Sequence, residues 1–280
     1  MNSPAGFYPL TACSLLCFCG SDATRYLNGQ LSIDISKLPP HEARSACLLD
    51  AKGRLCALLH LWREADRFII EVPTSRLEEI QARLERYIIA DDVEVSILPN
   101  TPTYHIFGHP APDGGLLINR LGIAGYDSNA RPAALSEVTP EEVERLRIIH
   151  GIPAWDRELT KTTLPQEARL ETTSVDFDKG CYVGQEIVSR LKSVAHVNKR
   201  LHGFRGTLPH PLPDGCTLHA DTESTTSVGR LTSAAPHFGM AQSVALGYLN
   251  RQFESLDHLH VRDPQGSIIG LVERHPFPIP

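Results

Sequence analysis

Two runs of alternating apolar residues, separated by a short turn, constrain the fold of this chain most strongly. The first run reads A-R-S-A-C-L-L from Ala43, the second reads R-L-C-A-L-L-H-L-W, and D-A-K-G lies between them. Alternation with a period of two predicts half-buried strands, and so short a connection predicts an antiparallel hairpin that turns at Ala51 and Lys52. In that register Cys47 and Cys56 are cross-strand neighbours. With 20 Gly and 21 Pro as further turn formers, an all-helical fold is excluded.

The pattern on either side of this hairpin predicts a layered α+β unit. A short helix begins at Ser21 or Asp22, upstream of the hairpin. Downstream, the strand R-F-I-I-E-V is followed by a helix that Thr74 can cap, and V-E-V-S-I-L forms the next strand. The predicted helix presents one apolar stripe, made of Leu77, Ile80, Leu84 and Tyr87. Such an order of elements favours an α+β sandwich.

A second, similar pass begins with the strands Y-H-I-F-G and L-L-I, and a helix follows them. The boundary signals of that helix are strong. They are Thr139 as N-cap, Pro140 at the first position, Glu142 completing a capping box, and Gly151 beyond the end.

Beyond Lys199 the sequence returns to strands without convincing helices. The segments are R-L-H-G-F-R-G, S-V-G-R-L-T-S-A, V-A-L-G-Y-L and a hairpin around D-P-Q-G. Short strands at this spacing predict a small antiparallel β-barrel. We therefore expect an α+β region over residues 1–195 and a barrel domain over residues 196–280.

Composition narrows the classes of function. The 27 basic and 33 acidic residues leave a net charge of −6, which argues against a protein that coats nucleic acid. No apolar run is long enough to span a membrane. The seven Cys form no Cys-x-x-Cys pair, and Cys13, Cys17 and Cys19 match no common metal-ligand spacing. We expect a cytoplasmic monomer with free thiols and no metal site.

The motif K-G-C-Y-V-G-Q-E, residues 179–186, is the most informative stretch. A strand-like S-V-D-F leads into two glycines, and Q-E-I-V-S-R-L then begins a helix, which places Cys181 beside a helix N-terminus. That position and the charge of Lys179 favour a reactive thiolate. The alternative is a small buried Cys in a glycine-rich turn. The residues alone leave both interpretations open.

Residues 187–213 contain no Asp or Glu but several basic side chains, which are Arg190, Lys192, Lys199, Arg200 and Arg205. This stretch predicts a local positive potential suited to carboxylates, phosphates or an RNA backbone. A solvated linker is the alternative.

Taken together, these residues resemble a known family. K-G-C-Y-V-G-Q-E is similar to the signature of the YgfZ-type folate-binding proteins, which are relatives of the glycine-cleavage T-protein, an aminomethyltransferase. Weaker matches occur in the expected order. They are G-S-D-A-T-R-Y-L-N-G-Q-L-S-I-D, L-P-Q-E, and V-G-R-L-T-S with A-L-G-Y-L.

The resemblance implies two intertwined ferredoxin-like α+β units and a C-terminal β-barrel around a central cavity for tetrahydrofolate. It implies that Cys181 and Lys179 form the functional turn together with Gly180 and Tyr182, and that Gln185 begins the helix behind it. Further cofactor-binding residues would be Asn28, Gln30 and Glu167. From charge alone we add Arg200 as a contact for the carboxylates of folate.

One departure from the T-protein pattern bears on the reaction. Where T-proteins have an Asn-Ala turn and then a catalytic Asp, this chain reads V-P-T-S-R-L-E-E from Val72. Aminomethyl transfer needs a carboxylate that assists proton movement at the folate nitrogen. This departure places that reaction in doubt.

The leading hypothesis is a tetrahydrofolate-binding accessory factor in iron–sulfur cluster assembly or repair that uses Cys181. Its partners would be iron–sulfur proteins or cluster-assembly factors, with effects on tRNA modification. The alternatives are a folate-dependent aminomethyltransferase and a tRNA-binding module, although direct nucleic-acid binding is disfavoured by the charge. Whether the chain is an enzyme stays open.

Overall fold

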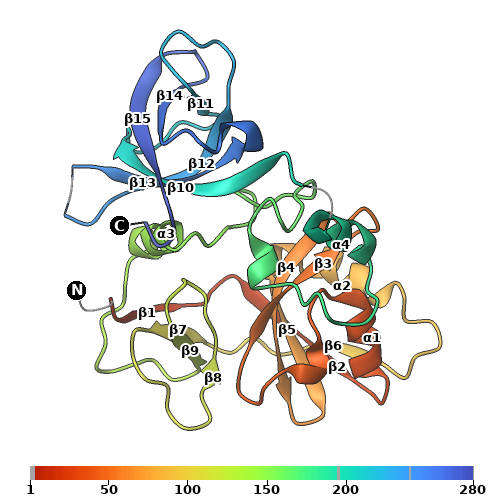
Figure 1. The fold of residues 1–280 in the computed structure, drawn as a ribbon. Coiled ribbons are helices and arrows are strands. Elements are labelled where there is room, and N and C mark those ends of the chain that lie inside the picture. Colours follow the sequence, from red (N-terminus) through yellow and green to blue (C-terminus); the bar gives the residue numbers. More distant parts are fainter. Residues whose placement is uncertain (1–3, 194–195, 240, 280) are drawn as a thin grey trace. The chain divides into compact units, whose positions relative to one another are not determined.

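The computed structural model describes residues 4–193, 196–239 and 241–279 (Figure 1). These residues form two compact units. The first unit comprises Met1–Val138, Lys161–Pro165 and Leu170–Val194, and the second comprises Thr139–Thr160, Gln166–Arg169 and Ala195–Pro280. Among the described residues, no helix combines the length and apolarity that crossing a membrane requires.

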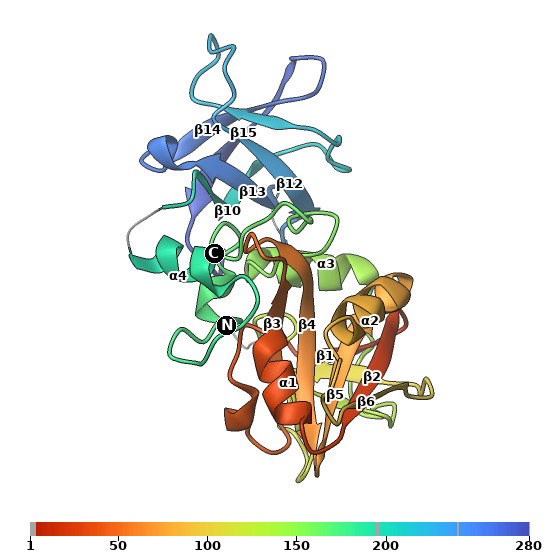
Figure 2. The same ribbon diagram turned by 90° about the vertical axis from the view of Figure 1, so that its right-hand side faces the viewer.

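A five-stranded antiparallel sheet is the centre of the first unit. Its order is β3-β4-β5-β2-β6, with β2 Cys13–Cys19, β3 Arg44–Leu49, β4 Leu55–Glu64, β5 Arg67–Pro73 and β6 Glu94–Ile97. The helices α1 (Ala23–Gln30) and α2 (Leu77–Glu85) pack on one face (Figure 2). Apolar side chains at alternate strand positions, such as Leu16 and Phe18, form the core beneath them.

The helices of the first unit follow the predicted pattern with two differences. Tyr87, predicted on the apolar stripe, lies beyond the end of α2 and is 42% exposed. Asp22 is the N-cap residue of α1, as the sequence indicates. Thr74 does not cap α2, because Thr74–Arg76 form a 3-10 turn and the helix begins at Leu77.

The β3–β4 hairpin is confirmed, but its predicted register is wrong. Cys47 pairs with Leu58, and Cys56 is the extra residue of a β-bulge, so the two cysteines do not face each other. The connection is also longer than two residues, because the Gly53 amide bonds to the Asp50 carbonyl and Gly53 adopts a φ of 71°. A longer loop and a bulge each shift the pairing by one residue.

A second, four-stranded sheet belongs to the first unit. Its order is β1-β7-β9-β8, with β1 Gly6–Pro9, β7 Tyr104–Phe107, β8 Leu116–Leu117 and β9 Gly125–Ser128. The predicted strands at Tyr104 and Leu116 are confirmed. An apolar cluster that includes Cys17, Trp62 and Ile118 packs the two sheets together.

The second unit contains the predicted barrel, which is closed and six-stranded. Its order is β10-β13-β12-β11-β14-β15, with β10 Lys199–Thr207, β11 Thr217–His219, β12 Gly229–Pro236, β13 Ser243–Asn250, β14 His258–Arg262 and β15 Ile268–His275. Helix α3 (Pro140–Ile149) packs on this barrel through Ile148 and Ile149. The sequence interval before residue 195 therefore contributes an element to the barrel unit.

The predicted capping box of α3 is present. The Thr139 hydroxyl accepts a hydrogen bond from the Glu142 amide at 3.2 Å, and the Glu142 carboxylate accepts one from the Thr139 amide at 3.0 Å. Gly151 follows the helix with a φ of 71°, a left-handed conformation that favours glycine.

Candidate functional site

The K-G-C-Y-V-G-Q-E motif forms a turn in the first unit that leads into helix α4 (Gln185–Ser193). The Gln185 amide donates to the Tyr182 carbonyl at 3.2 Å, which starts the helix as predicted. The preceding S-V-D-F is not a strand, contrary to expectation. Its backbone bonds individually to another loop instead of joining a ladder: the Asp176 amide donates to the Ser32 carbonyl at 2.9 Å.

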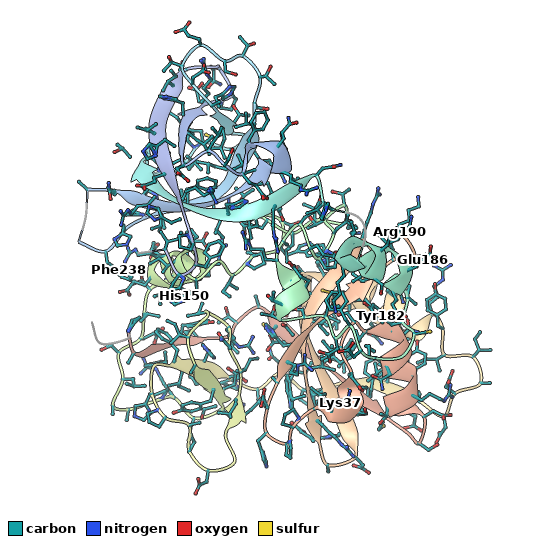
Figure 3. All side chains as sticks on the ribbon, in the orientation of Figure 1. Lys37, His150, Tyr182, Glu186, Arg190 and Phe238 are labelled. Atoms are coloured by element: carbon teal, nitrogen blue, oxygen red, sulfur yellow. The ribbon has the colours of Figure 1, made fainter. Side chains whose placement is uncertain are left out.

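Cys181 lies on the exposed part of this turn. All seven cysteines are described and free, and six of them are buried or half-buried, which leaves Cys181 as the exposed thiol. It precedes the first residue of α4 by four positions. Figure 3 shows Tyr182, Glu186 and Arg190. Glu186 and Arg190 on α4 form an exposed ion pair at 3.1 Å. Reagents in solvent therefore have direct access to the thiol.

Cys181 should be the first cysteine to react with a small alkylating reagent. Accessibility controls thiol labelling, so we expect iodoacetamide to modify Cys181 at least about tenfold faster than the buried Cys47 and Cys216. Peptide mass spectrometry of a time course would measure each rate. Faster modification of a buried cysteine than of Cys181 would contradict this exposure.

Lys179 holds the turn against α1 and the chain that follows it. Its ammonium group donates hydrogen bonds to the carbonyls of Asn28, Leu31 and Ile33, at 2.8, 2.7 and 2.6 Å. An ammonium has three donors, so these carbonyls use all of them. The Lys179 nitrogen also lies 5.1 Å from the centre of the Tyr182 ring. Burial lowers the pKa of Lys179 to about 8. The expected partner of its charge was Cys181, but its ammonium is directed at backbone oxygens.

A second set of hydrogen bonds, to the Asp176 carboxylate, also joins the chain before the motif to the chain that follows α1. Arg44 on β3 donates two hydrogen bonds to that carboxylate, at 2.9 and 2.8 Å, and the Asp34 amide donates a third at 2.7 Å. Bidentate pairs of this kind fix orientation as well as distance. Residues 28–34 and 174–184 are therefore fastened together although about 150 residues separate them in the sequence.

The tip of the β3–β4 hairpin also packs against the turn, at Gly184. Gly184 has a φ of 85°, and a Cβ added there would lie 2.6 Å from the Asp50 carbonyl oxygen and 3.1 Å from the Gly53 Cα. Gly53 in turn approaches the Ile187 side chain of α4. The two glycines permit a backbone contact that no other residue would allow.

The other predicted site residues divide between the two units. The Asn28 amide oxygen accepts from the Ile35 amide at 3.0 Å, and the Gln30 amide oxygen accepts from Arg83 at 3.0 Å, so both side chains stabilise the first unit. Tyr182 is buried and Gly180 is exposed. Gln185 begins α4.

Glu167 and Arg200 lie in the second unit. The Glu167 carbonyl accepts from the Leu201 amide at 2.8 Å, which places Glu167 beside the strand residue next to Arg200. The Glu167 residue is buried, at 8% exposure.

Sequence reasoning missed Asp176, Arg44 and Ser32. The Ser32 hydroxyl donates to the Ser174 carbonyl at 2.5 Å and accepts from the Cys47 amide at 2.8 Å. An Asp inside an apolar S-V-D-F, directly before the motif, was a signal for a buried charged partner. The sequence did not predict which residue that partner is, because Arg44 lies 132 positions away.

The acidic side chain Glu79 lies in the first turn of α2, directly after the V-P-T-S segment where the T-protein pattern is lost. Glu79 in the first turn accepts from Lys161 at 3.0 Å and from Arg76 at 3.2 Å. These pairs, with Lys161 as the main cause, lower the pKa of Glu79. Across the described residues, no group of three or more His, Cys, Asp or Glu side chains is arranged to hold a metal ion.

Comparisons with known proteins agree with this geometry at the level of fold and relationship. No family model matches the chain. It is 27% identical over 224 residues to a protein of Phaeosphaeria nodorum named iron-sulfur cluster assembly factor IBA57 homolog, mitochondrial, covering 70% of this chain and 54% of that protein. It is 26% identical over 212 residues to the tRNA-modifying protein YgfZ of Aliivibrio fischeri, covering 67% and 66%.

A putative chloroplastic transferase of Arabidopsis thaliana is 24% identical over 287 residues, covering 85% of this chain and 63% of that protein. The chain thus spans between about half and two-thirds of the length of these curated relatives. Among solved structures, the glycine cleavage system aminomethyltransferase T of Bartonella henselae superposes with a TM-score of 0.81 at 18% identity, covering 99% of this chain and 86% of that one. This match confirms the predicted fold class.

Proposed function

We propose that this chain is a YgfZ-type relative of the glycine-cleavage T-protein and acts as a tetrahydrofolate-binding accessory factor in iron–sulfur cluster assembly or repair. The names of two relatives, a cluster assembly factor and a tRNA-modifying protein, support this role and an effect on tRNA modification. The structural observation that supports it most is an exposed thiol, Cys181, on a turn that the rest of the first unit fixes.

In this proposal Cys181 contacts the cargo and Lys179 positions the turn. A thiolate is a soft ligand and a nucleophile, so Cys181 is suited to hold iron, sulfur or a one-carbon group in transit. Lys179 has no spare donor for that cargo, because three carbonyls occupy its ammonium. Client proteins would be iron–sulfur enzymes or cluster-assembly factors.

The donor chemistry of the predicted folate residues fits tetrahydrofolate in part. The amide oxygens of Asn28 and Gln30 accept hydrogen bonds within the first unit, so these side chains stabilise the fold. Glu167 supplies a carboxylate for the N–H edge of a pterin, and Arg200 supplies a guanidinium for the carboxylates of folate. Bound tetrahydrofolate would supply a carrier for a one-carbon group.

Replacing Cys181 by serine should separate ligand binding from function. The substitution preserves volume on an exposed turn, so we expect tetrahydrofolate to bind within about twofold of wild type. The variant should fail to restore iron–sulfur enzyme activity in cells that lack the protein, because a serine hydroxyl stays protonated at neutral pH. Calorimetric titration and a complementation assay measure the two effects.

Two controls make this experiment decisive. Cys19→Ser removes a half-buried thiol and should restore activity fully. Arg200→Ala should weaken the binding of tetrahydrofolate. Arg190→Ala, which breaks an exposed ion pair on α4, should leave that binding unchanged. Full rescue by Cys181→Ser would remove the thiol from the function, and absence of tetrahydrofolate binding by wild type would refute the folate assignment.

An aminomethyltransferase is the second candidate, because the T-protein shares this fold. The engagement of Glu79 by Lys161 and Arg76 argues against a free carboxylate at the start of α2. Release of ammonia from an aminomethylated lipoyl carrier in the presence of tetrahydrofolate would favour this candidate.

A further inference from the structure

The second sheet of the first unit carries a groove of about 450 Å³, apart from the Cys181 turn. A row of directly paired residues crosses this sheet: Phe7 on β1, Ile106 on β7, Tyr126 on β9, Leu117 on β8, and Glu42 in the chain before β3. Side chains alternate between the two faces of a sheet and paired residues share a face, so all five side chains lie on one face. The last three of the row line the groove.

The cover over this row ends partway along it. Phe7 and Ile106 are buried and Tyr126 is 9% exposed, because loop side chains pack over them. The next side chain, Leu117, is 45% exposed. The groove therefore begins at Tyr126, where the cover ends, and continues over Leu117 to Glu42. Two strand spacings, about 10 Å, separate Tyr126 from Glu42.

Two polar groups of the groove have no partner within the part of the chain that the structure describes. The Tyr126 hydroxyl makes no hydrogen bond there, although a buried tyrosine hydroxyl usually has one. The Glu42 carboxylate makes neither a hydrogen bond nor an ion pair there. Glu42 is also the only Asp, Glu, Lys or Arg among the described residues that line the groove. The groove thus offers a negative charge at one end and a hydroxyl at the other.

The neighbouring polar groups leave this carboxylate available. Arg44 lies close enough to interact with the charge of Glu42, but its guanidinium donates two hydrogen bonds to Asp176, which is the main cause that raises the pKa of Arg44. His109 also lines the groove, and its Nδ1 donates to the Pro110 carbonyl at 2.9 Å. A cation from outside can therefore bind Glu42 without displacing an existing hydrogen bond.

The shape of the groove favours a side chain over a free small molecule. Small-molecule sites enclose most of the surface of their ligand, whereas Leu117 and the exposed Asn119 leave this groove open. A side chain that arrives on a partner protein brings its own cover, because the surface that carries it closes the groove. Arginine fits best, since its aliphatic stem packs on apolar surface and its guanidinium binds a carboxylate through two parallel hydrogen bonds. Lysine lacks that planar fork.

We propose that this groove docks an arginine side chain from an extended segment of a partner protein. The arginine stem lies on Leu117, its guanidinium donates to the Glu42 carboxylate, and a backbone N–H of the segment donates to the Tyr126 hydroxyl. This inference goes beyond the proposed function, since the groove shares no lining residue with the turn at 179–185.

Titration with blocked pentapeptides tests the proposal. The peptide A-A-R-A-A should cause saturable shifts in the backbone amide NMR signals of Leu117, Asn119 and Tyr126. The same peptide with citrulline, which has the shape of arginine without its charge, should bind at least about tenfold more weakly. Propylguanidine, a free guanidinium on the same stem, should bind at least about threefold more weakly than the arginine peptide, because it lacks the backbone N–H groups.

Two substitutions locate the binding. Glu42→Gln keeps the size of the side chain and removes its charge, so the arginine peptide should bind at least about tenfold more weakly. Leu117→Ser removes the apolar floor beneath the stem and should weaken the peptide at least about threefold. The matched control is Glu94→Gln, at an exposed position of β6 outside the groove, which should leave the affinity unchanged. The same NMR spectra show whether each variant is folded.

Four outcomes would contradict the docking of an arginine. No saturable shift with wild type, equal affinity for the arginine and citrulline peptides, or an unchanged affinity in folded Glu42→Gln would each overturn the proposal. Propylguanidine that binds as tightly as the arginine peptide would also overturn it, because the groove would then be a site for a free small molecule.

Discussion

Replacing Glu158 by alanine should lower the free energy of unfolding of the second unit by about 3 to 5 kcal/mol. Glu158 is fully buried, and its carboxylate accepts hydrogen bonds from Arg147, Thr232, Ser233 and the Ala154 amide at 2.6 to 3.0 Å. Alanine would remove the acceptor and leave these donors, one of them charged, without it. Each unsatisfied buried donor costs about 1 to 3 kcal/mol.

Amide hydrogen exchange measures this loss where it occurs. Strands β12 and β13 surround Glu158, because Thr232 and Ser233 lie on β12 and the Tyr248 hydroxyl on β13 donates to the Glu158 carbonyl at 3.0 Å. Their protection should fall in Glu158→Ala. The matched control is Glu137→Ala, which breaks an exposed pair with Arg131 and should cost less than about 1 kcal/mol. Equal losses in the two variants would show that the buried carboxylate does not hold this unit together.

Local signals made parts of the fold predictable from sequence. The boundaries of α3 follow from Thr139, Glu142 and Gly151, because capping bonds join residues three or four positions apart. The barrel strands β10, β12, β13 and β15 have eight or nine residues, which is long enough for alternation to show, whereas β11 has three residues and is not predicted. By contrast, β1 and β9 have four residues each and no distinctive pattern, and β7, the pairing partner of β1, lies far along the chain. The bulge at Cys56 likewise depends on packing that a single sequence does not display.

In the candidate site, too, the features set by neighbouring residues were predictable from the sequence, and those set by distant residues were not. The glycines of the motif predicted a turn before a helix, and the structure has both. The direction of the Lys179 side chain was not predictable, because a lysine reaches several partners and the competing carbonyls belong to residues 28–33. Where a charge lies near a thiol in sequence, its hydrogen-bond partners decide which group it acts on.

The two glycines of the motif, Gly180 and Gly184, should differ strongly in their tolerance of alanine. Gly184 has a φ of 85°, which costs a residue with a side chain about 1 to 2 kcal/mol, and its new Cβ would lie 2.6 Å from the Asp50 carbonyl oxygen. Backbone shifts that relieve such overpacking cost about 1 to 3 kcal/mol more. Gly184→Ala should therefore destabilise the first unit by about 2 to 5 kcal/mol.

Gly180→Ala is the matched control within the same turn. A Cβ there meets no atom within 4 Å, and the φ of Gly180 lies outside the left-handed region, so we expect a change below about 0.5 kcal/mol. Urea unfolding followed by Trp62 fluorescence in the Trp155→Phe background compares the two variants in the first unit. Because Gly184 sets the contact between the Cys181 turn and the hairpin tip, Gly184→Ala should also change the alkylation rate of Cys181, whereas Gly180→Ala should not. A similar stability for both variants would mean that the turn tolerates displacement from the hairpin, and that the backbone contact does not position the thiol.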